Sequence, residues 1–372
     1  MTLTDEWPCH RPIPLPRWNL LQAPCQMHFH DILEFEDFVG KLDFVLQCSL
    51  ATHPYNSVSN FLTFYESFKV ASFNNRALSL RDHFRNTTPK LIPNRHTCVG
   101  LTLALKEEVE TTLGIARGHF FVAACEEIVS NPEEFASRSP PNQDAVQMEH
   151  VLLALNIRID NEERQGLLFL DPGYHTSRVI IVMNDGVYPN TGWFRGTSSP
   201  AVRRDLCFNR VSSDYVECLV RDTRGSNGAG MSVDTVNVIY VGHHFLSAVN
   251  HSEHRNIIYP RKFWIARDMK GTTTAGLTLS LERAERGINC FINGGQEQLR
   301  LLQSTDLGSM FLTRSEFFTS LASELKLDVT TLLSTLHQLQ CVLYEDPAFI
   351  SQVLNINQDV EAIGMGDLQV VH

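Results

Sequence analysis

The sequence predicts a soluble α+β fold, in which a helix carrying a cysteine packs on an antiparallel sheet. Two patterns predict it. Apolar residues recur at helical spacing through most of residues 29–129, and from His150 onward short apolar runs alternate with polar turns. With 372 residues, 43% of them hydrophobic and 20% charged, the chain can bury a core without disulfides or metals.

Charge and composition exclude several functional classes. The net charge of −11 argues against general nucleic-acid binding, which needs a basic face to neutralise phosphates. No apolar stretch is long enough to span a bilayer, and prolines interrupt the N-terminus where a signal peptide would be apolar. Nine cysteines without a Cys-x-x-Cys pair favour free thiols in a reducing compartment. We therefore expect a cytoplasmic protein that binds neither nucleic acid nor membrane, and its oligomeric state stays open.

The first half of the chain is predicted to be mainly helical. Residues 1–25 form a proline-rich extended arm, and residues 26–195 combine a helical part with the candidate site. A helix is predicted over Cys98–Leu113, because apolar residues there recur at steps of four and Thr97 or His96 can cap it. A further helix is predicted over roughly His119–Val129.

After the turn-rich loop Ser137–Asp144 the period of the apolar residues changes. Short turns join three predicted strands, which indicates an antiparallel meander. These strands are His150–Ile159, Gly166–Leu170 and Arg178–Met183. Residues 196–372 are predicted to be strand-rich and to end in helices near Arg314–Leu325 and Val329–Leu343.

Three residues occupy places that suit a thiol nucleophile, its base and an orienting acid. Cys98 opens a helix, whose free N–H groups and dipole favour a thiolate and can stabilise an oxyanion. His150 begins one strand and Asp171 ends the next, so their side chains meet if the strands are antiparallel. The carboxylate can then hold the imidazole tautomer that faces the sulfur. The order and spacing predict a Cys98–His150–Asp171 catalytic triad.

These residues resemble the transglutaminase-like superfamily, which includes transglutaminases, cysteine proteases, peptide N-glycanases and arylamine N-acetyltransferases. The resemblance covers roughly residues 92–190 and depends on the cysteine, the histidine and the run Leu170-Asp171-Pro172-Gly173. It implies a papain-like or transglutaminase-like core, with Cys98 as nucleophile, His150 as base and Asp171 as orienting acid. The wider layout is similar to that of the acetyltransferases, which would make acetyl-CoA the acyl donor. No metal or redox cofactor is required.

The sequence leaves the reaction class open. Transfer to water would make the protein a hydrolase, such as a thiol protease or amidase, and transfer to an amine would make it an acyltransferase. The expected substrates are a protein, a peptide or a small amine. The flanking residues depart from the family, because His96-Thr97 precede the cysteine where transglutaminases have Gly-Gln. The alternative is an inactive member of the same fold that serves as a binding or scaffold protein.

Other polar residues compete for roles in this chemistry. His96 and His175 are rival partners for the thiol, and Asn94 is a candidate side-chain donor to an oxyanion. A metal-dependent hydrolase is a third hypothesis, although the spacing matches no His-Glu-x-x-His pattern. Its ligands would come from the densest histidine cluster, His243, His244, His251 and His254, with Glu253.

Overall fold

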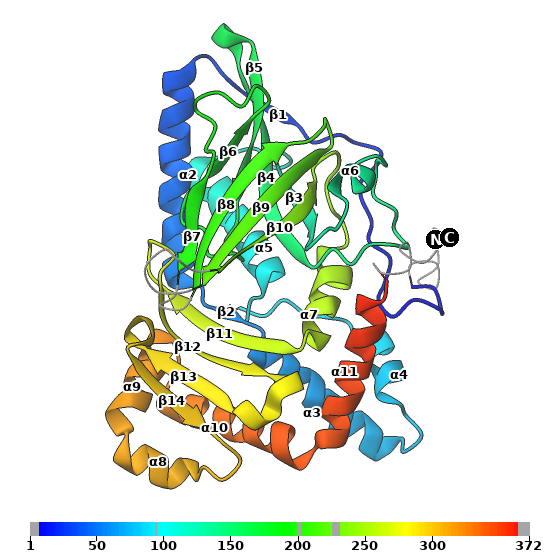
Figure 1. Ribbon diagram of the computed structural model, residues 1–372, viewed down its shortest axis with the longest axis vertical. Helices are drawn as coiled ribbons and strands as arrows, with labels where there is room; N and C mark the ends of the chain where they lie inside the picture. Colours follow the sequence, from blue (N-terminus) through cyan, green and yellow to red (C-terminus); the bar gives the residue numbers. More distant parts are fainter. Residues whose placement is uncertain (1–6, 94, 199–201, 225–230, 364–372) are drawn as a thin grey trace.

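Two sheets and the helices around them make up the computed structural model (Figure 1), which describes residues 7–93, 95–198, 202–224 and 231–363. Within these residues, the larger sheet has nine strands and the smaller sheet has five. Helices and antiparallel strands are thus combined in one chain, and the predicted α+β class is confirmed. No helix in the described part of the chain is long and apolar enough to cross a membrane.

The larger sheet runs in the order β6-β5-β4-β3-β10-β9-β8-β7, with every neighbouring pair antiparallel. Strand β1 lies parallel to the second half of β4. The strands are β1 (Gln26–Phe29), β3 (Phe120–Glu126), β4 (His150–Ile159), β5 (Arg164–Leu170), β6 (Ile180–Met183), β7 (Phe194–Ser198), β8 (Val202–Arg210), β9 (Tyr215–Arg224) and β10 (Met231–Tyr240). This sheet continues across residues 195 and 196, where the sequence suggests a division of the chain.

The larger sheet curls, so that β6 approaches β8 and apolar side chains fill the concave side. Helices α2 (Ile32–Thr52) and α5 (Cys98–Leu113) cover its other face. Because successive side chains of a strand alternate between faces, Leu153 and Leu155 of β4 pack with the helices, while Leu152 and Ala154 face the concave side. The helix that carries Cys98 is therefore seated on the centre of an antiparallel sheet.

The smaller sheet, in the order β14-β13-β12-β11-β2, shares a second core with helices from both ends of the chain. Phe61 and Phe84 from the early helices pack in the same cluster as Leu277 of the sheet and Phe318 of a late helix. The strands are β2 (Tyr55–Asn56), β11 (Arg261–Arg267), β12 (Thr273–Ser280), β13 (Ile288–Ile292) and β14 (Glu297–Leu301). The helices are α3 (Val58–Asn74), α4 (Leu80–Asn86), α8 (Leu307–Thr313), α9 (Ser315–Glu324), α10 (Val329–Gln340) and α11 (Pro347–Glu361).

The predicted elements fare differently. The helix Cys98–Leu113 and the three-strand meander beginning at His150 are confirmed. The helix predicted over His119–Val129 is wrong, because residues Phe120–Glu126 form β3 in the middle of the larger sheet. All seven side chains of β3 are buried, and a short run that is apolar up to its last residue, Glu126, has no period that separates helix from strand.

Candidate active site

Cys98 is the first residue of α5, and its side chain is buried, with 4% of the residue exposed. Thr97 caps the helix, since its Oγ1 accepts the Val99 N–H at 3.3 Å. The first N–H groups of a helix have no acceptor within it, and the helix dipole is positive at this end. The sulfur thus lies where a negative charge, on itself or on a bound oxygen, is stabilised.

His150 and Asp171 meet as the antiparallel pairing of β4 and β5 requires. Nε2 of His150 donates to the Asp171 carboxylate, at 3.0 Å from Oδ2 and 3.1 Å from Oδ1. Both residues are buried. Because Nε2 carries its proton toward the carboxylate, Nδ1 is the ring nitrogen left to act on a nucleophile.

Gly173 lies between the imidazole and the cysteine. A Cβ at this position would be 2.6 Å from His150 Cε1 and 2.8 Å from Cys98 Cβ, so both residues flank the same glycine. Burial lowers the pKa of His150, but the Asp171 carboxylate and the hydrogen bond with Cys98 outweigh burial and raise this pKa well above its ordinary value. The imidazolium form of His150 is therefore favoured beside the cysteine.

The turn that follows β5 holds the carboxylate and the imidazole together. The Tyr174 N–H donates to Asp171 Oδ1 at 2.9 Å, and the Tyr174 ring stacks on His150 with centroids 4.0 Å apart and planes 3° apart. The Tyr174 hydroxyl donates to the Glu127 carboxylate. Arg267 of β11 donates to the Pro172 carbonyl, which ties this turn to the smaller sheet. The imidazole is thus fixed at its edge and over one face.

Asn256, in the short helix α7 (His254–Ile258), also reaches the sulfur. Its Nδ2 lies 3.7 Å from Cys98 Sγ and 3.2 Å from Thr97 Oγ1. The sequence analysis missed Asn256 and Tyr174. Tyr174 directly follows the Asp-Pro-Gly run and could be found by extending that motif. Asn256 carries no local signal, because it comes from a helix far along the chain.

The rival histidines face other groups. His96 packs against Gly100, and its ring lies beside that of His53, with centroids 5.9 Å apart. Burial lowers the pKa of His96, and burial with the nearby Arg267 charge lowers the pKa of His175 well below its ordinary value. Both are therefore favoured as neutral imidazoles. Asn94 lies outside the described residues.

The histidine cluster is dispersed, and each ring makes a different hydrogen bond. The partners are the Tyr240 hydroxyl for His243, the Val122 N–H for His244, the carbonyls of Pro14 and Gln147 for His251, and the Phe84 carbonyl for His254. Glu253 accepts from Thr97 and Asn60 instead. In the parts of the chain that are described, no three His, Cys, Asp or Glu side chains are arranged to hold a metal ion.

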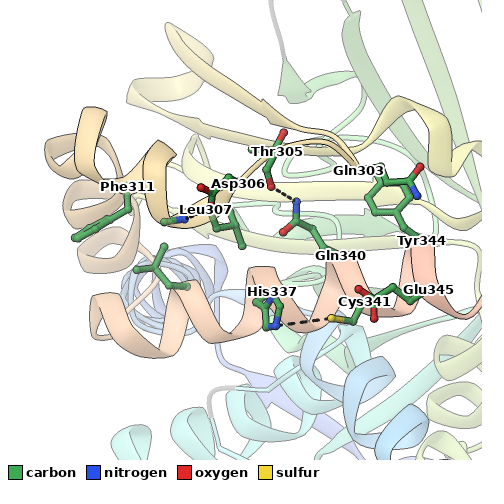
Figure 2. Close-up of a pocket in the computed structure, with 12 residues that line it drawn as sticks. Gln303, Thr305, Asp306, Leu307, Phe311, His337, Gln340, Cys341, Tyr344 and Glu345 are labelled. Carbon is green, nitrogen blue, oxygen red and sulfur yellow. Dashed lines mark hydrogen bonds between the residues drawn. The ribbon is translucent and has the colours of Figure 1, made fainter.

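A cavity of about 660 Å³ lies away from these residues, between α8 and α10. Figure 2 shows a second cysteine–histidine pair at its wall, with Cys341 Sγ 3.8 Å from His337 Nε2. The lining mixes apolar side chains, such as Leu307 and Phe311, with polar ones, such as Asp306 and Gln340. None of the three triad residues lines this cavity.

Comparison with known proteins adds little to this geometry. No protein-family model matches the sequence, and no curated protein matches it. Among solved structures, the arylamine N-acetyltransferase from Mycobacterium abscessus is similar, with a TM-score of 0.39 and 11% identity over 80% of this chain and 88% of that chain. A TM-score this low does not establish a shared fold.

Proposed function

We propose that this protein transfers acyl groups through a thioester on Cys98, with His150 as base and Asp171 as the acid that orients it. One observation carries the proposal. The Asp171 carboxylate holds His150 Nε2 at 3.0 Å, which leaves Nδ1 for a sulfur at a helix N-terminus. This arrangement supports the partners that nucleophilic catalysis by a thiol needs, a base for the sulfur and an acid that orients the base.

The reaction proceeds in two halves. The Cys98 thiolate attacks the carbonyl carbon of the donor, forming a carbon–sulfur bond and a tetrahedral oxyanion. As this intermediate collapses, the imidazolium of His150 gives its proton to the leaving group and the thioester remains. An acceptor then attacks the thioester while neutral His150 takes the acceptor's proton; the carbon–sulfur bond breaks, and the thiolate–imidazolium pair is regenerated. Asp171 stabilises the imidazolium during both halves.

The acceptor decides the reaction class. An amine would make the protein an acyltransferase, whereas water would make it an amide or peptide hydrolase. The resemblance to acetyltransferases in the layout of the sequence favours acetyl-CoA as the donor, acting as a substrate and not as a resident cofactor. As part of the same proposal, the core of the protein is papain-like or transglutaminase-like.

The second candidate function is a scaffold protein that keeps the fold without the chemistry. The burial of Cys98 favours it, since only 4% of this residue is exposed and a carbonyl carbon must still reach the sulfur. The departures before the cysteine, His96-Thr97, point the same way.

A single labelling experiment separates the two functions. The protein is mixed with p-nitrophenyl acetate, release of p-nitrophenolate is followed by absorbance, and acid-quenched protein is mapped by mass spectrometry. Acyl transfer predicts a burst close to one equivalent, with one acetyl group on Cys98, and its loss after alkylation by iodoacetamide. A folded protein that shows no burst and no acetyl group on Cys98 would favour the scaffold.

A further inference from the structure

The half-buried side chain of Asn256 lies beside Cys98 but has no role in the mechanism given above. It projects from α7, which lies between the two sheets (Figure 1), and reaches both the cap and the first residue of α5. We propose that Asn256 is a catalytic residue, and that its Nδ2–H donates to the oxyanion formed during attack by Cys98. This inference deepens the proposed acyl transfer and rests on it.

The hydrogen bonds around Thr97 fix which end of the amide faces the sulfur. Thr97 Oγ1 donates its only proton to the Glu253 carboxylate, so it can only accept from Asn256. The atom beside it must therefore be the nitrogen of the amide, and the side-chain oxygen must point away. The orientation of Asn256 follows from its neighbours.

The amide nitrogen has two protons, and its neighbours are Thr97 Oγ1, Cys98 Sγ and the Glu253 carboxylate. One N–H bonds Thr97 Oγ1 at 3.2 Å. The other is directed to Cys98 Sγ at 3.7 Å, a long contact to a weak acceptor. When the carbonyl carbon of a substrate is bonded to this sulfur, its oxygen would lie close to the sulfur and about 3 Å from Asn256 Nδ2. It would be a stronger acceptor than the sulfur and would draw the N–H away from it.

The position of Asn256 is reinforced from behind. Lys262 is fully buried, and its Nζ donates to the Asn256 carbonyl at 3.0 Å and to the Ile257 carbonyl at 2.8 Å. Glu253, which orients Thr97, is held in turn by Asn60 at 2.7 Å. A donor that is fixed before the reaction loses no free energy to reorganisation when the charge develops.

The backbone N–H of Cys98 supplies the natural second donor. It belongs to the first turn of α5, whose N–H groups have no acceptor within the helix. Together, the backbone N–H of Cys98 in α5 and the Nδ2–H of Asn256 in α7 form an oxyanion site with two donors. Such a pair stabilises the tetrahedral intermediate without binding the planar ground-state carbonyl equally well.

The test compares two reactions of the same sulfur in Asn256→Ala and Asn256→Leu, the second of which retains the side-chain volume. Acylation by p-nitrophenyl acetate passes through an oxyanion, whereas alkylation by iodoacetamide does not. We expect acylation to fall about 10²–10³-fold, while alkylation stays near the wild-type rate. Asn250→Ala, an identical change at an exposed site in the preceding turn, should alter neither reaction.

Thermal melting identifies which Asn256 variant keeps the wild-type fold. The acylation and alkylation rates of that variant are then compared with those of the wild type. Unchanged acylation in it would overturn the inference. An equal fall in acylation and alkylation would also overturn it, because Asn256 would then act on the thiolate and not on the oxyanion. If wild-type protein alkylates at Cys98 but never becomes acetylated, the proposed function itself fails, and this outcome is separate from the other two.

Discussion

Two cysteine–histidine pairs in the described part of the chain are built in opposite ways. Cys98 and His150 come from distant parts of the chain and are buried where α5 meets the larger sheet. Cys341 and His337 are four residues apart on one helical face, where His337 is exposed and Cys341 partly so. The second pair borders a cavity of about 660 Å³, whereas the first does not.

In the proposed mechanism, the two pairs differ in the carboxylate partner of the histidine and not in the presence of a cavity. A carboxylate holds His150, and the charge of that carboxylate raises the pKa of the imidazole well above its ordinary value. Around Cys341, burial and then the charge of Glu345 raise the pKa of the thiol. One environment therefore favours a protonated imidazole on His150, and the other disfavours the thiolate of Cys341.

The largest effect should come from removing the sulfur of each pair in turn. We expect Cys98→Ala to reduce acylation by p-nitrophenyl acetate at least about 10⁴-fold, because Cys98 forms the thioester in the proposed mechanism. Cys341→Ala should leave the rate near that of wild type. A burst that survives in Cys98→Ala and disappears in Cys341→Ala would contradict the proposal, because Cys341 would then be the nucleophile.

The second test removes the carboxylate beside each pair. Asp171→Asn should reduce acylation roughly 10²–10⁴-fold, because an amide can present its oxygen or its nitrogen to Nε2 and no longer fixes the tautomer. Glu345→Gln, beside Cys341, is the matched control and should have no effect. Similar rates in the two variants would mean that Asp171 is only a turn residue.

A third comparison uses one glycine from each region. Gly173→Ala places a methyl group against the ring of His150 and the backbone of Cys98, so one of them must move. We expect about a 10²-fold loss of acylation, the cost of displacing a catalytic group by about 1 Å. Gly308→Ala, at the cavity wall, meets only an ordinary 3.4 Å contact with Asp306 and should be silent. Circular dichroism of both variants separates misplacement from unfolding.

The smallest effect is a pH dependence of stability, measured best in the Cys98→Ser background, where the hydroxyl does not titrate in this range and can still form a hydrogen bond with His150. Since the folded pKa of His150 is raised by Asp171, its stabilisation is fully present below the unfolded value of about 6.5 and is lost as the pH rises through the folded pKa. Urea titrations should therefore show stability falling with pH above about 6.5, with a slope of at most about 1.4 kcal/mol per pH unit for one proton.

Adding His150→Gln to that background should remove the slope. Adding Asp171→Asn instead leaves burial as the main influence, which lowers the pKa of His150, and nuclear magnetic resonance of the imidazole protons should record that fall. An imidazole that keeps its raised pKa without Asp171 would contradict the role given to the carboxylate.

The sequence predicted those parts whose signals are local. Thr97 and the four-residue spacing of Leu101, Leu105 and Val109 locate α5, and the turns at the strand ends locate β4 and β5. The relation of His150 to Asp171 follows from one antiparallel pairing. These features depend on capping, periodicity and turn chemistry, which a single segment contains.

The parts that the sequence did not predict depend on tertiary position. The run Phe120–Glu126 became a strand because it lies between β4 and β10, and nothing within it specifies those neighbours. Asn256 reaches Cys98 only because α7 packs against the start of α5, and no spacing relates residues so far apart. The union of α3 and α4 with the smaller sheet has the same origin.

The packing of α3 and α4 against the smaller sheet affects how the chain folds during synthesis. Phe61 and Phe84 emerge from the ribosome early, but the surfaces that bury them, including Leu277 and Phe318, are synthesised much later. Contacts so distant in sequence form slowly and leave apolar helices uncovered in the meantime. A nascent or truncated chain that ends before β11 would expose α3 and α4, and it should depend on chaperones or aggregate even though the strands around His150 are already complete.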